Sequence, residues 1–169
     1  SFSSELNSGI NMNDLQQKIS NTQQKITDVI EKATKERRKL TKKDIKELKK
    51  YYDDLKKLHE EQSKYYANNL TALVQAVNDG LELNEESAQE ILKQGKANMD
   101  AALKAEEQAH NDRITAIEKI YKDDEAARKK AIAQENADYA KHKEEIKSAF
   151  ADLTSTVTNG YAEQNLAED

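Results

Sequence analysis

The sequence predicts an all-α protein built from long coiled-coil helices. Ala, Glu, Lys, Leu and Arg make up close to half of the 169 residues, which is typical of coiled coils. Proline is absent and glycine occurs only four times, so few residues are available for the turns of a thick globular core. Charged residues reach 35%, a value found both in disordered chains and in long exposed helices. Apolar residues recur three and four positions apart, which favours helices.

Three short motifs mark helix starts. In "LTKKDI", Thr41 and Asp44 have the spacing of a capping box, and Leu40 and Ile45 have that of a hydrophobic staple. The same pattern recurs in "INMNDL" and, more weakly, in "LNEESA". We therefore expect N-caps at three positions: Asn11, Thr41 and Asn84.

The predicted helices cover 12–39, 42–78 and 85–158 in one elongated domain, with a frayed start at 1–11 and a frayed tail at 159–169. "NDG" at 78–80 and "NG" at 159–160 supply glycines that can end a helix in the left-handed conformation. No glycine or proline separates the first two helices, so this joint is expected to be a kink rather than a reversal.

An antiparallel hairpin that turns at Gly80 matches the lengths of the two arms. The first two helices form a kinked first arm, and the third helix returns along it. Pairing residues whose numbers sum to 165 brings apolar residues together, for example Leu48 with Ile117 and Tyr66 with Met99. The predicted coiled-coil residues, called seam residues below, are Met12, Leu15, Ile19, Ile26, Val29, Ile45, Leu48, Leu55, Leu70, Leu73, Leu92, Leu103, Ile114, Ile117, Ile132, Tyr139, Ile146 and Leu153.

Two polar residues interrupt the seam in the middle of the second helix. His59 and Gln62 occupy seam positions, and Glu106 lies opposite His59 in the predicted register. Such residues form a polar layer that fixes the alignment of helices at some cost in stability. A poorly packed seam is the alternative.

No pattern indicates catalysis, a cofactor or a metal. The one E-x-x-H, Glu107 to His110, has the spacing of a ferritin-like metal ligand pair, but neither His59 nor His142 completes a second. We expect no enzyme and no catalytic, cofactor-binding or metal-binding residues.

Charge and hydropathy limit the partners. The net charge of -5 draws the chain neither to nucleic acid nor to anionic lipid, and no apolar run is long enough to span a bilayer. The basic run "KERRKLTKK", 35–43, is a candidate phosphate site or a solvated joint. Cysteine is absent, and the start at Ser1 without methionine leads us to expect a fragment or a processed chain.

The stretches "KKYYDDLKKLHEEQSKYYANNL" and "ITAIEKIYKDDEAARKKAIAQENADYAKHKEEIKSAF" resemble the helical midsections of tail tape measure proteins from phages and prophages of Gram-positive bacteria. The resemblance implies a structural helical rod that helps to set tail length and packs with copies of itself. It also implies contacts with tail tube or tail assembly proteins, in the host cytoplasm during assembly and then in the virion tail.

Two other functions are considered. A secreted or surface helical hairpin resembling type VII secretion substrates is the main alternative, because Tyr121 to Glu125 gives Y-x-x-x-E, although the turn "DGLELN" lacks W-x-G. A helical enzyme or metal carrier would need more than one E-x-x-H.

Overall fold

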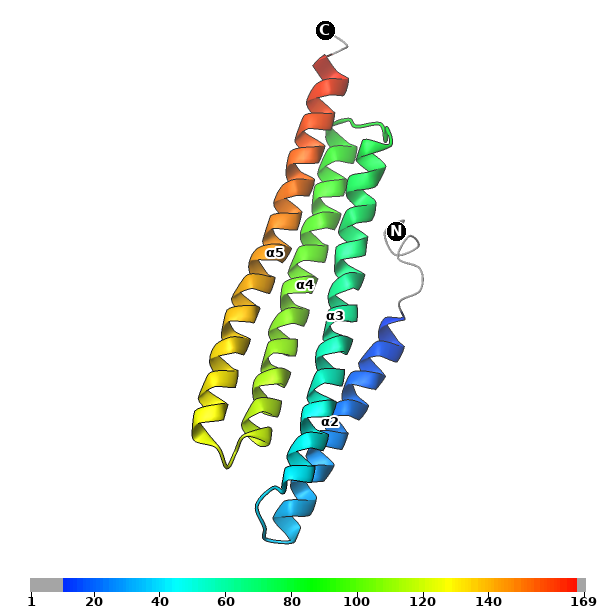
Figure 1. Ribbon diagram of the computed structural model, residues 1–169. Helices are drawn as coiled ribbons and strands as arrows, with labels where there is room; N and C mark the ends of the chain where they lie inside the picture. Colours follow the sequence, from blue (N-terminus) through cyan, green and yellow to red (C-terminus); the bar gives the residue numbers. More distant parts are fainter. Residues whose placement is uncertain (1–10, 167–169) are drawn as a thin grey trace. The chain divides into compact units, whose positions relative to one another are not determined.

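A computed structural model describes residues 11–166 and confirms the all-α prediction. It contains four helices, α2 (Met12–Lys35), α3 (Lys42–Asn78), α4 (Glu85–Ile120) and α5 (Glu125–Leu166), and no strand in the described range (Figure 1). Except for Asn11, the predicted frayed start lies outside these residues, as do 167–169.

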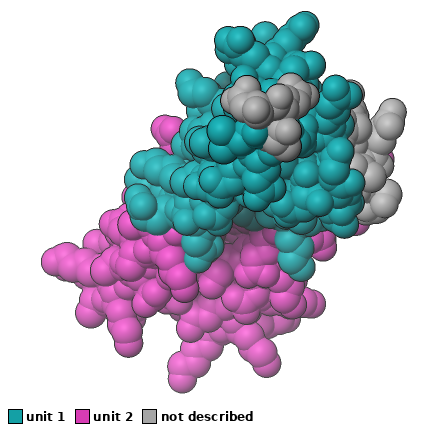
Figure 2. Space-filling view, turned by 90° about the horizontal axis from the view of Figure 1, so that it is seen from above, with its two compact units in different colours: residues 1–10, 63–105, 142–169 teal, residues 11–62, 106–141 magenta. Residues whose placement is uncertain are grey.

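The chain divides into two compact units where the sequence predicts one domain. Unit 1 comprises 63–105 and 142–166 of the described residues, and unit 2 comprises 11–62 and 106–141 (Figure 2). Helices α3, α4 and α5 each contribute residues to both units, whereas α2 belongs to unit 2.

The predicted kink between the first two helices is wrong, because the chain reverses there. Helix α2 ends at Lys35, and Arg37 adopts the left-handed conformation with φ 50°. The Arg38 N–H donates to the Ala33 carbonyl and the Arg37 N–H to the Thr34 carbonyl, both at 3.1 Å, which is a Schellman motif. The motif needs no glycine when an L-residue accepts the strain, so the absence of glycine was a misleading signal.

Helix α2 consequently lies antiparallel to the first part of α3 within unit 2 (Figure 1). The Lys25 ammonium lies 5.8 Å from the centre of the Tyr51 ring, a cation–π distance. Lys119 of α4 donates to the Thr27 hydroxyl at 3.4 Å, so α2 also meets α4. The predicted pairing of 12–39 with the end of the third predicted helix, 85–158, is therefore wrong.

The predicted continuous helix 85–158 is wrong, because α4 ends at Ile120, the chain reverses at 121–124, and α5 runs back along α4 (Figure 1). Asp124 caps the new helix, because its side chain accepts from the Ala127 N–H at 3.1 Å and its carbonyl from the Arg128 N–H at 2.9 Å. The "DDEAA" sequence carries this cap signal and Glu125 in the first turn, but no helix start was predicted here.

The capping contacts at the three predicted helix starts are present. Asn11 accepts from the Asp14 N–H at 3.1 Å, and Asn84 accepts from the Ser87 N–H at 2.8 Å. At the capping box, the Asp44 N–H donates to the Thr41 hydroxyl at 3.1 Å while the Thr41 N–H donates to the Asp44 carboxylate at 2.9 Å.

The two glycine-containing ends differ from each other. Gly80 turns the chain as predicted, with φ 98°, and the Leu81 N–H donates to the Ala76 carbonyl. Gly160, by contrast, does not end α5, which continues to Leu166 in place of a frayed tail. A Cβ at Gly160 would lie 3.0 Å from Leu83, so this glycine permits close packing.

Unit 1 packs the end of α3, the start of α4 and the last part of α5 around an apolar core. Gly95 lets α4 approach α5, because a Cβ there would clash with the fully buried Leu153. Asn98 donates to the Tyr66 carbonyl at 2.9 Å, one residue from the predicted pairing of Tyr66 with Met99. The buried core residues are Leu70, Leu73, Val77, Leu83, Ile91, Leu153 and Val157.

Unit 2 has a core of the same kind, built from α2, α3 and α4. Its apolar side chains that are at least nine-tenths buried are Leu15, Ile19, Ile26, Ala33, Leu40, Leu48, Leu55, Ala109, Ala116, Ile117 and Ile120. The corresponding part of α5 places only one residue, Glu135, fully inside. A buried polar contact therefore helps to hold this part of α5 in unit 2.

Replacing Arg37 with glycine is expected to stabilise unit 2 by about 1 kcal/mol, because a left-handed conformation costs an L-residue roughly 1–2 kcal/mol and glycine very little. Urea unfolding measures the change. Glu31→Gly, at an exposed position in the interior of α2, is the control and should destabilise by about 1 kcal/mol. Equal effects of the two substitutions would contradict the assignment of the left-handed turn.

Candidate functional site

The most elaborate polar arrangement in unit 2 is a buried charge network centred on Arg113 of α4. The three ends of its guanidinium group each meet a different side chain. Nε donates to Glu135 of α5 at 2.7 Å, Nη2 to Glu106 of α4 at 2.8 Å, and Nη1 to His59 Nδ1 of α3 at 3.1 Å. The network therefore joins three helices through one side chain.

Glu135 extends the network to a second histidine. Its other carboxylate oxygen, Oε2, lies 2.9 Å from Nδ1 of His110, one turn before Arg113 on α4. The His110 ring stacks on the Tyr139 ring with centroids 4.0 Å apart and planes 6° from parallel. Tyr139 lies one turn after Glu135 on α5. Helices α4 and α5 therefore contact each other twice at His110, once through Glu135 and once through Tyr139.

The helical period brings these residues onto common faces. Glu106, His110 and Arg113 are separated by four and three residues, which places them on one side of α4. Arg113 is 4% exposed, Glu135 4% and His59 5%. Buried charges of this kind are tolerated only when they are paired and hydrogen-bonded, as they are here.

Burial sets the charge states of two members. Burial by itself lowers the pKa of Arg113, but hydrogen bonds and charges from Glu135 and Glu106 raise the pKa above its usual value, so the guanidinium stays charged. Burial, with a smaller contribution from Arg113, lowers the pKa of His59 to about 3.

His59 is therefore neutral at pH 7, and its Nδ1 accepts from Arg113 while the proton resides on Nε2. The Asp112 carboxylate lies 3.8 Å from Nε2. Because His59 is uncharged, this contact is not an ion pair, and the distance is too long for a hydrogen bond.

The acceptor atoms of the network already have partners within the chain. Both Glu135 oxygens and the acceptor nitrogen of His59 are already engaged, so neither side chain is free to take a proton from a substrate. Within 11–166, no group of three or more His, Cys, Asp or Glu side chains is placed to hold a metal ion. Glu107 is exposed, so the E-x-x-H motif does not turn both of its residues inward.

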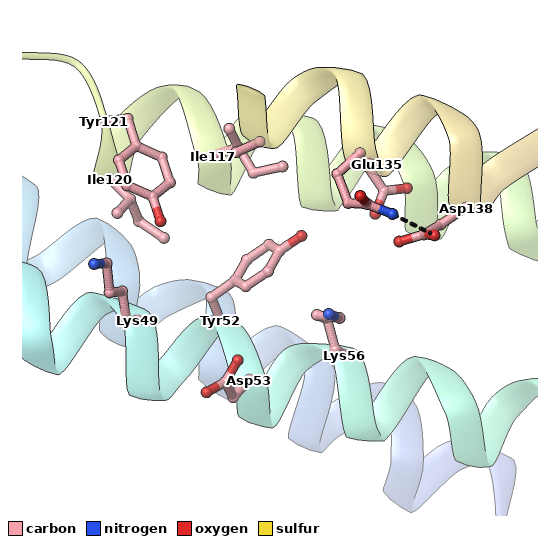
Figure 3. Close-up of a pocket in the computed structure, with 11 residues that line it drawn as sticks. Lys49, Tyr52, Asp53, Lys56, Ile117, Ile120, Tyr121, Glu135 and Asp138 are labelled. Atoms are coloured by element: carbon pink, nitrogen blue, oxygen red, sulfur yellow. Dashed lines mark hydrogen bonds between the residues drawn. The ribbon is translucent and has the colours of Figure 1, made fainter. Parts of the chain in front are cut away.

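A cavity of about 340 Å³ lies beside the network, between α3, α4 and α5 of unit 2 (Figure 3). Figure 3 shows Tyr52 reaching from α3 toward Ile117 and Glu135. Burial, followed by the charge of Glu135, raises the pKa of Tyr52 to about 12, so its hydroxyl remains a donor at neutral pH.

The charged groups that line this cavity interact largely with their neighbours. Lys49 lies 5.7 Å from the centre of the Tyr121 ring, and Lys56 lies 5.7 Å from that of Tyr52. Asp138 accepts from Gln134 at 3.0 Å. Cations on α3 thus face carboxylates on α5, and the lining does not single out one class of ligand.

No family model, curated protein or solved structure matches this chain. No helix in the described range is both long and apolar enough to cross a bilayer. The site is therefore interpreted from its geometry alone.

The structure brings together two of the three residues predicted for a polar layer. Arg113 links His59 to Glu106, and Gln62, the third, is also buried, with 8% exposure. The predicted layer did not include Arg113, Glu135 or His110. A signal existed, because the inward face of α4 repeats every eleven residues at Ile91, Ala102 and Arg113. The predicted seam residues Leu92, Leu103 and Ile114 have the same spacing but lie one residue later, on larger apolar side chains.

The seam residues divide evenly between two degrees of burial. Those that are at least nine-tenths buried are Leu15, Ile19, Ile26, Leu48, Leu55, Leu70, Leu73, Ile117 and Leu153. Those that are half-buried are Met12, Val29, Ile45, Leu92, Leu103, Ile114, Ile132, Tyr139 and Ile146. The second group contains the predicted positions of α5 in unit 2, where Glu135 takes the inward place.

Replacing Arg113 with methionine is expected to cost roughly 3–5 kcal/mol of unfolding free energy, because it leaves two buried carboxylates without their cation. Urea unfolding at pH 7 measures this loss. Lys130→Met, at an exposed position of α5, is the matched control and should change stability by less than about 0.5 kcal/mol. A loss below about 1 kcal/mol at Arg113 would contradict the network's structural role.

Acid should destabilise the protein partly through His59. Its pKa is about 3 in the fold against an ordinary 6.5, so the unfolded chain binds more protons between these values, and stability falls as the pH drops through this window. The expected slope reaches about 1.4 kcal/mol per pH unit below pH 6. His59→Gln should remove this slope while His142→Gln keeps it, as measured by urea unfolding from pH 7 to 5. Parallel curves for the two variants would contradict the buried neutral state.

Proposed function

We propose that this chain is a structural segment of a phage tail tape measure protein, acting through the folded length of its helices and through self-association. The observation that supports a structural role best is the Arg113 network. Each of the three guanidinium nitrogens of Arg113 donates to a side chain of the same chain, which suits the fixing of helix register. Catalysis would instead need open groups that converge on a substrate.

The folded segment would contribute less length than an extended one. A single helix of 169 residues would measure about 250 Å at 1.5 Å per residue. Reversals at 36–41, 79–84 and 121–124 divide the chain into helices of 24 to 42 residues. The proposed role is therefore a folded spacer within the parent protein, with copies of that protein and tail tube or assembly proteins as partners.

Deleting the segment from a parent tape measure protein tests this function. Electron microscopy of assembled tails should show shorter tails, by clearly less than the roughly 250 Å expected for an extended helix. Shortening by the full extended length would mean that the segment unfolds into a rod in the tail. Tails of unchanged length would overturn the proposed function.

A further inference from the structure

The start of α3 and the end of α2 form a strongly basic surface in unit 2. Residues 32–50 contain ten Lys and Arg side chains against three carboxylates. The reversal at Arg37 brings the two halves of this segment together. Among the described residues, eight of the ten cations are exposed and form neither a salt bridge nor a cation–π contact: Lys32, Lys35, Arg37, Lys39, Lys42, Lys43, Lys46 and Lys50.

The three carboxylates of this surface are already engaged. Arg38 contacts both Glu36 and Asp44, the latter at 2.6 Å. The backbone N–H of Thr41, followed by Arg38, lowers the pKa of Asp44 to about 2. Glu47 accepts from Tyr51 at 2.9 Å. Ten cations less three carboxylates leave 32–50 with a net charge of +7.

The neighbouring turn only partly offsets this charge. Asp123 lies 3.4 Å from the Leu40 N–H, so the turn between α4 and α5 adjoins the basic surface. It adds Lys122, Asp123 and Asp124, which together contribute one negative charge. The surface therefore stays positive on a chain whose net charge is -5.

An acidic surface of comparable size lies in unit 1, around the turn after α3. Stretches 78–92 and 159–166 contain no Lys or Arg. They meet in the fold, because Gln164 donates to the Leu81 carbonyl at 3.0 Å and accepts from the Leu83 N–H at 2.6 Å. The exposed carboxylates of this surface are Asp79, Glu82, Glu85, Glu86, Glu90 and Glu163, and none belongs to a salt bridge of the described residues.

Apolar side chains are exposed within the same acidic surface. Leu81 is 38% exposed, Tyr161 36% and Leu166 70%, and these are the exposed large hydrophobic residues of the described range. Lysine and arginine side chains of a partner can cover these apolar side chains, because their aliphatic parts pack along apolar surface while the charged group stays in water. Eight exposed lysines and arginines on one surface match that requirement.

We propose that the basic surface of one copy docks on the acidic surface of the next, giving head-to-tail association of this chain. Opposite charge on the two surfaces favours contact between the basic surface of one copy and the acidic surface of another, and like surfaces repel each other. Because the two surfaces differ, the contact is heterologous, and each copy in such a pair keeps one surface free for a further copy. This contact specifies the self-association named in the proposed function, and it rests on that function only for self-association.

A second copy is a better partner than nucleic acid. The basic surface by itself suits phosphate groups, but the acidic surface and the net charge of the same chain repel a polyanion. Contact between copies of this chain engages both the basic and the acidic surface. An oligonucleotide would bind the basic surface and be repelled by the acidic one.

Sedimentation at several protein and salt concentrations tests the association. At about 0.02 M salt, where charges act over roughly 20 Å, the weight-average mass should rise with protein concentration beyond that of one chain. At about 1 M salt, where the screening length is near 3 Å, it should return toward the single-chain value.

Charge-reversal variants make the test specific. Reversing the basic surface (Lys42→Glu, Lys43→Glu, Lys46→Glu) or the acidic surface (Glu82→Lys, Glu85→Lys, Glu86→Lys) should each weaken association at least about tenfold. Mixing the two variants should restore association, because the reversed surfaces are again opposite in charge. The control reverses three exposed lysines of α5 (Lys130→Glu, Lys141→Glu, Lys147→Glu) and should associate like the unaltered chain.

Circular dichroism confirms that every variant keeps its helices, so that unfolding is not mistaken for loss of contact. A chain that stays single at all salt concentrations overturns the proposal, as does association that the two surface reversals leave unchanged. A chain that stays single but binds a 20-base-pair DNA duplex through Lys42, Lys43 and Lys46 assigns the basic surface to nucleic acid instead. None of these results depends on the tail-length experiment, so the two proposals fail separately.

Discussion

The guanidinium of Arg113 is the constraint on which unit 2 depends. Once this charge is buried, it requires Glu106 and Glu135 to compensate it and a neutral His59 to accept its third hydrogen bond. Those partners lie on three helices, so the register of α3, α4 and α5 in this unit is coupled to one side chain. An axial shift of one helix would leave a buried charge without its partner, which costs several kcal/mol. An apolar seam of leucine and alanine tolerates such shifts at lower cost.

The Arg113 network explains why α5 buries few apolar side chains in unit 2. Its inward residue there is Glu135, flanked by half-buried Ile132 and Tyr139. In unit 1 the same helix contributes Leu153 and Val157 to an ordinary apolar core. Unit 1 is thus held mainly by burial of apolar area and unit 2 in part by directional hydrogen bonds, which agrees with a fold that specifies alignment as well as stability.

Local sequence signals predicted the helices well and their connections poorly. Capping at Thr41 and the glycine turn at Gly80 depend on neighbours within a few residues, so the sequence contains what is needed to recognise them. The reversal at Arg37 has no such signal, because an arginine enters the left-handed conformation only when tertiary packing repays the strain. The cap at Asp124 did have a signal, which the regular apolar spacing on either side of it obscured.

The site was predictable only where a polar residue interrupted an apolar pattern. His59 interrupts the seam of α3, and the register then pointed to Glu106. Arg113 and Glu135 lie in stretches already rich in charge, where one more charged residue does not stand out. Deciding which of many charges is buried requires the relative rotation of three helices, and that rotation depends on the packing of all of them.

The most direct test of this account is a distance measurement by double electron–electron resonance between spin labels at Lys57 of α3 and Asn136 of α5, two exposed positions in unit 2. The unaltered network should give one narrow distance distribution. The distribution should broaden or split, with helix content retained, when the network is replaced by apolar side chains through His59→Leu, Glu106→Leu, His110→Phe, Arg113→Met and Glu135→Leu. An equally narrow distribution in that variant would contradict the claim that the buried charges fix the register.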